Sequence, residues 1–176
     1  HPVEMFYRDN RLNPIHEGTT GIQALDLLGR KVPMKNFAGF KAIMKEMSGT
    51  IAIASQNKDL QVHAQNLGVA MEKLQAVTTV VMKATLEKDT DLVFSNSVSY
   101  LDMFGHIVIA WLWLKQGIVA SNALTKAPHK EDEDFYKGKM QAMQYFYRSE
   151  LPQIYHWAEL VSSIDSTSFD MQAEWF

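Results

Sequence analysis

Apolar side chains recur at helical spacing along most of this 176-residue chain. The clearest stretch lies between residues 60 and 85. There, apolar or small side chains are separated alternately by four and three positions, at Leu60, Ala64, Leu67, Met71, Leu74, Thr78, Val81 and Thr85. A seam of this heptad-like period is typical of a helix that packs antiparallel against its neighbours in a bundle, at a crossing angle of about 20°. We therefore predict a long helix here with one buried side.

The same period predicts three further long helices. The first covers residues 35–55, and its predicted inner face consists of Phe37, Phe40, Ile43, Met44 and Met47. Polar segments at 88–91 and 127–132 delimit a second helix over residues 91–125, with Thr90 or Asp91 as its N-cap. The last covers residues 131–165. It should bend near Pro152, because a proline inside a helix removes one backbone hydrogen bond and clashes with the preceding turn.

Strand signals are nearly absent, since the sequence has few β-branched alternations and no Asn-Gly or Asp-Gly turn. We predict an all-α fold in which residues 34–165 form a four-helix up-down bundle. Residues 1–33 form a separate N-terminal segment with two short helices. One covers residues 3–12 and stops before Pro14, and the other covers 21–29 with Thr19 or Thr20 as its N-cap. Residues 166–176 are a tail without a period.

Charge and cysteine content narrow the classes of function. The net charge is −3, from 17 basic and 20 acidic residues, so the chain lacks the basic surface of a nucleic-acid binder. It has no cysteine, which excludes disulfides, thiolate metal sites and thiol nucleophiles and fits a reducing compartment. Residues 1–15 contain no apolar signal-peptide core. We expect a cytoplasmic location in a bacterium, with the mitochondrial matrix as the alternative.

Two further kinds of site are not expected. The most apolar run, residues 107–114, is too short to cross a bilayer, so we predict a buried helix and no membrane span. Di-iron bundles use paired Glu-x-x-His motifs. Here His156 precedes Glu159 in the reverse order, and Asp102 and His106 lie four residues apart. We therefore predict no metal site.

The candidate chemistry lies near the start of the chain, at Glu17, Gly18 and Thr19. A carboxylate in a loop before a helix suits removal of a proton from carbon, provided that its pKa is raised by burial beside a ligand. The alternative is an ordinary helix start with a capping threonine, because acidic residues and threonine are both favoured at helix N-termini. Spacing alone does not separate these two interpretations.

A longer pattern separates them. The chain reads Tyr-Arg-Asp at residues 7–9, Glu-Gly-Thr at 17–19 and Gly-Ile-Gln at 21–23, which resembles a segment of acyl-CoA dehydrogenases. The resemblance implies that Glu17 removes the α-proton of an acyl-CoA thioester while FAD accepts a hydride from the β-carbon. It implies that Gly18 lets the substrate approach the main chain. It also implies that the Thr19 hydroxyl contacts FAD, and that Thr20 and Gly21 lie against the same cofactor.

In that family the segment lies late in the catalytic domain, so the chain resembles the C-terminal piece of a longer flavoenzyme. Residues 34–165 resemble the extra C-terminal helical domain of larger members, including those acting on methylthio-propanoyl-CoA and on fatty acyl-CoAs. The resemblance implies a homo-oligomeric parent that passes electrons to an electron-transfer flavoprotein, and a fragment that is inactive alone. The alternative is a non-catalytic helical module for interaction or oligomerisation.

Overall fold

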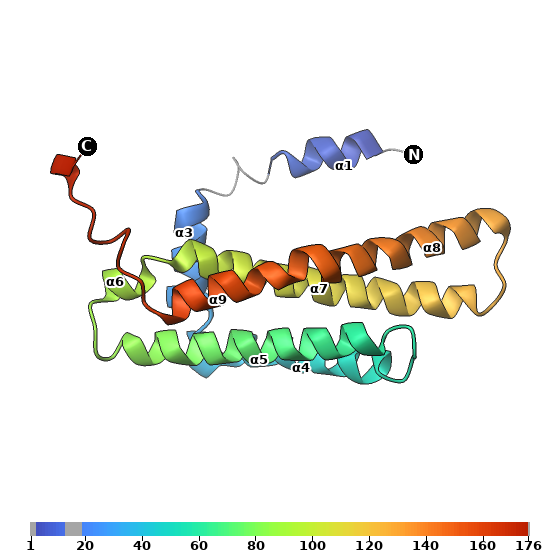
Figure 1. The fold of residues 1–176 in the computed structure, drawn as a ribbon, viewed down its shortest axis with the longest axis horizontal. Helices are drawn as coiled ribbons and strands as arrows, with labels where there is room; N and C mark the ends of the chain where they lie inside the picture. Colours follow the sequence, from blue (N-terminus) through green and yellow to red (C-terminus); the bar gives the residue numbers. More distant parts are fainter. Residues whose placement is uncertain (1–2, 13–18, 176) are drawn as a thin grey trace.

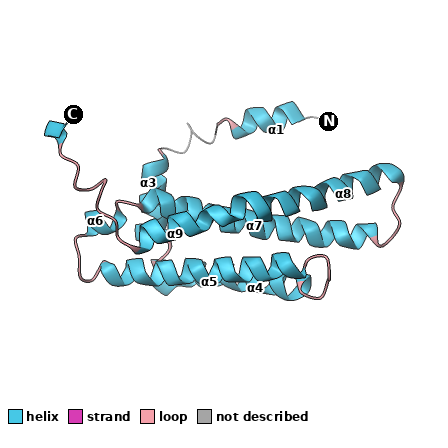
Figure 2. Cartoon of the chain, viewed as in Figure 1, coloured by secondary structure: helices cyan, strands magenta, loops and turns pink. Residues whose placement is uncertain are grey.

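The computed structural model describes residues 3–12 and 19–175, and every regular element within these ranges is a helix (Figures 1 and 2). The predicted all-α fold is confirmed. The N-terminal helices are α1 (Val3–Asn10) and α3 (Thr20–Leu25), and α3 continues as a π-helical turn over Asp26–Lys31. Thr19 is the N-cap of α3, as one of the two predicted alternatives states.

The bundle consists of four long helical segments of the described chain, which alternate in direction (Figure 1). These are α4 (Met34–Ala54), α5 (Gln61–Ala84), α7 (Ser97–Leu124) and a composite fourth segment. The fourth begins with α8 (Lys130–Tyr145) and passes through a π-helical turn and a 3-10 turn (Phe146–Glu150 and Leu151–Gln153) into α9 (Ile154–Ser162). The 3-10 turn contains Pro152, so the predicted bend is confirmed.

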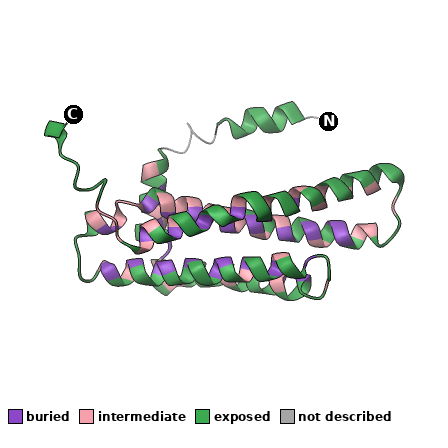
Figure 3. Ribbon diagram, viewed as in Figure 1, coloured by how far each residue is buried: buried purple, intermediate pink, exposed green. Residues whose placement is uncertain are grey.

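The two helices at the centre of the bundle are α5 and α7. α7 packs against α5, α8 and α9, while α4 packs against both α5 and α7. The predicted seam of α5 is buried at all positions from Leu60 to Val81, and only Thr85 is partly exposed. It faces a matching run on α7 at spacings of three and four, consisting of Tyr100, Met103, Ile107, Ala110 and Leu114. Figure 3 shows buried stretches, in purple, recurring along both α5 and α7.

Gly117 sets the distance between α7 and α8. A methyl group in its place would overlap the sulfur of Met143 and lie 3.3 Å from the Leu60 side chain. Both neighbours are fully buried, so neither has free space into which to move. The close approach of the two helices therefore depends on this glycine.

The predicted helix over 91–125 is in fact two helices, α6 (Thr90–Phe94) and α7, with a bend at Ser95 and Asn96. Asn96 donates from its side-chain nitrogen to the carbonyl oxygen of Asp165 at 2.8 Å, a bond across the fold that the local pattern does not reveal. The predicted N-caps Thr90 and Asp91 are also wrong. The cap is Asp89, whose Oδ1 accepts from the backbone N–H of Asp91 at 2.8 Å.

The first turn of α4 departs from regular helix geometry. Lys35, Asn36 and Phe37 have φ of 49°, 54° and 63°, which places three consecutive non-glycine residues in the left-handed region. Such residues cost about 1–2 kcal/mol each, because the side chain crowds the following carbonyl oxygen. The Lys41 ammonium donates to the carbonyl oxygen of Asn36 at 3.0 Å and so holds this turn against the regular part of α4.

The apolar stretch is longer than the sequence argument allowed. Thr90–Leu124, which contains α6 and α7, is long and apolar enough to cross a membrane by length and composition alone, and 33% of its most apolar window is buried. The argument from a run of eight residues is therefore wrong. α7 packs against the other long helices, as the central helix of a bundle does, and such helices are apolar on most sides. The absence of a membrane span stays a prediction.

Candidate functional site

The predicted base and its neighbour, Glu17 and Gly18, lie outside the described residues. The described part of the site begins at Thr19, which has extended φ and ψ of −75° and 148°. Its carbonyl oxygen accepts from the N–H of Gln23 at 3.1 Å, and its Oγ1 accepts from the N–H of Ile22 at 3.5 Å. A hydroxyl has one proton to donate and a second lone pair. The exposed Thr19 side chain can therefore cap the helix and still donate a hydrogen bond to a ligand.

α3 holds these residues against the bundle. Ala24 and Leu28 are fully buried, and α3 and the π-helical turn both pack against α7. Gly29 permits a close contact of the π-helical turn with α6, since a methyl group there would lie 3.0 Å from the ring of Phe94. Thr20 is exposed and Gly21 is partly exposed at the free end of the helix. The three predicted cofactor positions thus share one rigidly supported helix start.

An open groove of about 670 Å³ runs beside this helix start. Its apolar lining includes Ile22, which is 65% exposed, and its polar lining includes Asp26, Arg30 and Lys31. Arg30 forms an ion pair with Asp26, and this hydrogen bond lowers the pKa of the Asp26 carboxyl and raises that of Arg30. The two cations, Arg30 and Lys31, outnumber the single carboxylate, Asp26, so the rim of the groove carries a net positive charge. A ligand with acidic groups is therefore favoured next to the candidate site.

The upstream part of the sequence pattern lies on α1, which carries no buried residue. Figure 1 shows α1 apart from the bundle. Arg8 pairs with Glu4 at 3.6 Å, and the Arg11 guanidinium donates to the Tyr7 hydroxyl at 3.3 Å. These contacts are local to the helix. The described structure therefore does not bring residues 7–9 into a common site with Thr19, Thr20 and Gly21.

The histidine and acidic pairs considered for metal binding have other surroundings. The Nδ1 atom of His106 lies 3.0 Å from the backbone carbonyl oxygen of Asp102, and its ring packs against Trp157 with 4.6 Å between centroids. His156 and Glu159 are exposed on α9. Among the residues 3–12 and 19–175, no group of three or more His, Cys, Asp or Glu side chains is placed to hold a metal ion.

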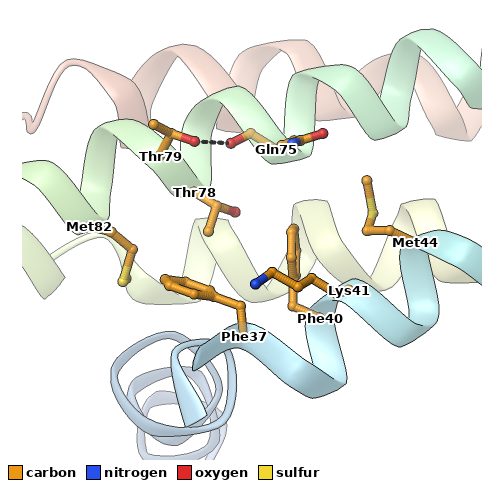
Figure 4. A pocket seen from close by; sticks show the side chains of 8 residues that line it. All are labelled: Phe37, Phe40, Lys41, Met44, Gln75, Thr78, Thr79 and Met82. Atoms are coloured by element: carbon orange, nitrogen blue, oxygen red, sulfur yellow. Dashed lines mark hydrogen bonds between the residues drawn. The ribbon is translucent and has the colours of Figure 1, made fainter. Parts of the chain in front are cut away.

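Sequence reasoning missed a second concave site. A groove of about 420 Å³ lies between α4 and α5. Figure 4 shows its apolar side chains Phe37, Phe40, Met44 and Met82, together with its polar side chains Lys41, Gln75, Thr78 and Thr79. Met44 is predicted on the inner face of its helix, but it is only partly buried, as is Met82. One signal in the sequence could have indicated this groove. It is the cation Lys41, which interrupts an otherwise apolar helix face between Phe40 and Met44.

Comparison with known proteins identifies the family to which the helical bundle belongs. Residues 43–172 match the family described as "Acetyl-CoA dehydrogenase C-terminal like". This match covers well over half of the chain, so the chain belongs to that family.

Three curated relatives are acyl-CoA dehydrogenases. A broad-specificity linear acyl-CoA dehydrogenase of Mycobacterium tuberculosis is 26% identical over 176 aligned positions, which cover 97% of this chain and 29% of the relative. A butyryl-CoA dehydrogenase of Syntrophomonas wolfei is 26% identical over 95% of this chain and 27% of the relative. A 3-methylmercaptopropionyl-CoA dehydrogenase of Ruegeria pomeroyi is 31% identical over 82% of this chain and 24% of the relative. The chain thus spans between a quarter and a third of the length of the first two.

Proposed function

We propose that this chain is the C-terminal part of a flavin-dependent acyl-CoA dehydrogenase in which Glu17 is the catalytic base. The alignment with the Mycobacterium tuberculosis relative carries the proposal. It leaves only 3% of the chain unmatched (100% minus 97%), which is too little to exclude residue 17, so it includes the Glu-Gly-Thr segment as well as the bundle. The division into residues 1–33, 34–165 and 166–176 is part of the proposal.

The proposed reaction forms a double bond between the α- and β-carbons of the thioester. Glu17 takes the proton from the α-carbon, and the hydride leaves the β-carbon. Bound FAD would supply the hydride acceptor. For Glu17 to act as a base near neutral pH, its pKa must be raised, and loss of water around the carboxylate on substrate binding has that effect. Gly18 admits the thioester close to the main chain, since it has no side chain.

The described residues fit a flavin contact at the start of α3. The Thr19 hydroxyl keeps a proton to donate after it caps the helix, and Thr20 and Gly21 leave the adjacent backbone accessible. The positive rim of the neighbouring groove favours the phosphates of FAD or of the CoA thioester. The chain covers less than a third of its relatives, so we expect the fragment alone to be inactive and to bind FAD weakly.

The partners of the whole protein are also part of the proposal. They are an acyl-CoA substrate, an electron-transfer flavoprotein as electron acceptor and further copies of the enzyme in a homo-oligomer. The three relatives are named for linear acyl-CoA, butyryl-CoA and 3-methylmercaptopropionyl-CoA. These names differ in the acyl group and therefore support the class of substrate rather than one compound. The bacterial sources of the relatives support a cytoplasmic location.

A second candidate is a helical module for interaction without catalysis. The observation that favours it is a set of apolar side chains on α7 and α8 that the described helices leave exposed, of which Val119 and Phe135 line one groove. The exposed fraction is 62% for Val119, 58% for Phe135 and 61% for Tyr145. A surface of this kind is typical of a contact with another subunit or domain. It is compatible with either function, because a catalytic parent would also cover it on assembly.

The experiment compares the full-length parent with its Glu17→Gln variant, using a panel of acyl-CoA substrates and an artificial electron acceptor. We expect the variant to keep its bound flavin and to lose turnover by about a hundredfold to ten-thousandfold, the usual contribution of a general base. Glu4→Gln is the matched control, because Glu4 is an exposed carboxylate on α1 and should leave turnover unchanged. A colourless parent or an active Glu17→Gln variant would favour the interaction module.

A further inference from the structure

The groove between α4 and α5 has the form of a small-molecule site. Its volume of about 420 Å³ lies within the range of pockets that hold ligands, and such pockets are mostly apolar with a few placed polar groups. Phe37, Phe40 and Met44 form the wall on α4, and Met82 belongs to the wall on α5 (Figure 4). Phe40 is fixed from behind by the ring of Phe104, with 6.1 Å between centroids. The apolar surface is therefore supported by the core.

One charged group enters this apolar surface. Lys41 contributes the only charge among the residues that line the groove. Its ammonium has three donors, and the structure assigns one of them to the carbonyl oxygen of Asn36. Within the described ranges, none of the ion pairs involves Lys41. A cation that keeps two donors beside an apolar wall is complementary to an anion attached to an apolar chain.

The strained first turn of α4 supports a binding role independently of the cavity. Its three left-handed residues end at Phe37, which lines the groove, and include Asn36, which holds the Lys41 ammonium. Strain of this kind is concentrated at ligand-binding and switch regions, because the surrounding structure must sustain its cost. Here the turn places both an apolar wall and the partner of the cation. A regular helix start would put neither group in its present place.

We propose that the α4–α5 groove binds the carboxylate of a medium-chain fatty acid. The carboxylate lies beside the Lys41 ammonium, and the chain lies against Phe37, Phe40, Met44 and Met82. The regular part of the α4 wall, from Phe40 to Met44, is about 6 Å long at 1.5 Å per residue, and Phe37 and Met82 extend the apolar surface, which suits a chain of medium length. The groove is lined by residues of α4 and α5 and its proposed use needs no flavin, so the proposal does not depend on the dehydrogenase assignment.

The test titrates the 176-residue chain with dansylated undecanoate and follows the dansyl fluorescence, with decanoate and decanol as competitors. We expect saturable binding of one probe per chain. Decanoate should displace the probe about fivefold more effectively than decanol. This factor is the affinity expected from one partly exposed ion pair between the carboxylate and Lys41. Lys41→Gln should remove that difference. Lys45→Gln is the matched control, because Lys45 is exposed one turn further along α4 and does not line the groove.

A second variant tests the location without touching the core. Thr79 is exposed and lines the groove from α5, and its hydroxyl donates only to the carbonyl oxygen of Gln75 in the previous turn. Thr79→Trp should fill the groove and weaken probe binding by more than about tenfold, with an unchanged circular dichroism spectrum.

Four results would overturn the proposal. The first three are probe binding that survives Thr79→Trp, equal competition by decanoate and decanol, and a dimer of the wild-type chain in sedimentation that Thr79→Trp dissociates. The dimer would assign the groove to a second copy of the chain. Binding to phosphatidylglycerol vesicles that Lys41→Gln abolishes, without displacement of the probe by free decanoate, would likewise replace the fatty acid with a membrane surface.

Discussion

The buried hydroxyl pair of Thr78 and Tyr100 should respond unequally to the loss of either partner. The Thr78 hydroxyl donates to the carbonyl oxygen of Leu74 at 2.7 Å and lies 2.7 Å from the Tyr100 hydroxyl. A hydroxyl has a single proton, so Tyr100 must be the donor within the pair. Tyr100 is fully buried, and burial raises its pKa to about 12, which keeps this proton in place at neutral pH.

The two substitutions leave different groups behind. Tyr100→Phe removes the donor and leaves the Thr78 proton bonded to Leu74, so we expect a loss of about 0.5–1.5 kcal/mol in the free energy of unfolding. Thr78→Val keeps the branched shape but leaves the buried Tyr100 hydroxyl without a partner, at a cost of about 1–3 kcal/mol. The double variant removes both groups and should resemble Tyr100→Phe alone. The expected coupling energy is therefore about −2 kcal/mol.

Urea unfolding at neutral pH, followed by circular dichroism, measures all four proteins. The comparison requires equal dependence of the unfolding free energy on urea, which shows that the unfolded states are alike. Additive losses in the double variant would refute the reasoning. A larger loss for Tyr100→Phe than for Thr78→Val would show instead that the donor had been assigned to the wrong residue.

Two further outcomes follow from the packing. Gly117→Ala should destabilise the chain by about 1–3 kcal/mol, because the added methyl group overlaps Met143 and crowds Leu60. Gly105→Ala on the same helix has open space around it and should stabilise the chain by about 0.5–1 kcal/mol, because alanine is the better helix former. Urea midpoints that shift in the same direction would contradict this. Burial lowers the pKa of His63, whose Nδ1 has no hydrogen-bond partner among the described residues. The stability that its neutral ring confers is therefore present above about pH 6.5 and is lost as the pH falls through the lower folded-state pKa. His63→Phe should flatten the melting temperature against pH in this acid range, and a profile as steep as that of the exposed-site control His129→Gln would refute it.

Part of the candidate site was predictable because it is local. Thr19 caps α3 through the N–H groups of residues three and four positions away, and a short sequence pattern contains all the partners. The assignment of Glu17 to catalysis rests on the longer resemblance over residues 7–23. Glu17 itself lies outside the described residues. The groove between α4 and α5 was not predictable. It depends on how Phe40 and Met82, 42 positions apart along the sequence (82 minus 40), are brought to the same cavity.

The sequence by itself determined the all-α fold, the four long helical segments of the bundle and the buried side of α5. The seam from Leu60 to Val81 and the bend at Pro152 follow from periodicity and proline geometry, which act over one or two helical turns. Only the tertiary structure decided the break between α6 and α7, the close approach at Gly117 and the left-handed residues in the first turn of α4. The first two are sustained by contacts between segments distant in the sequence, and the third is held by the hydrogen bond from Lys41 to the carbonyl oxygen of Asn36. Local propensity gives no signal for such features, since their cost is offset by packing elsewhere in the molecule.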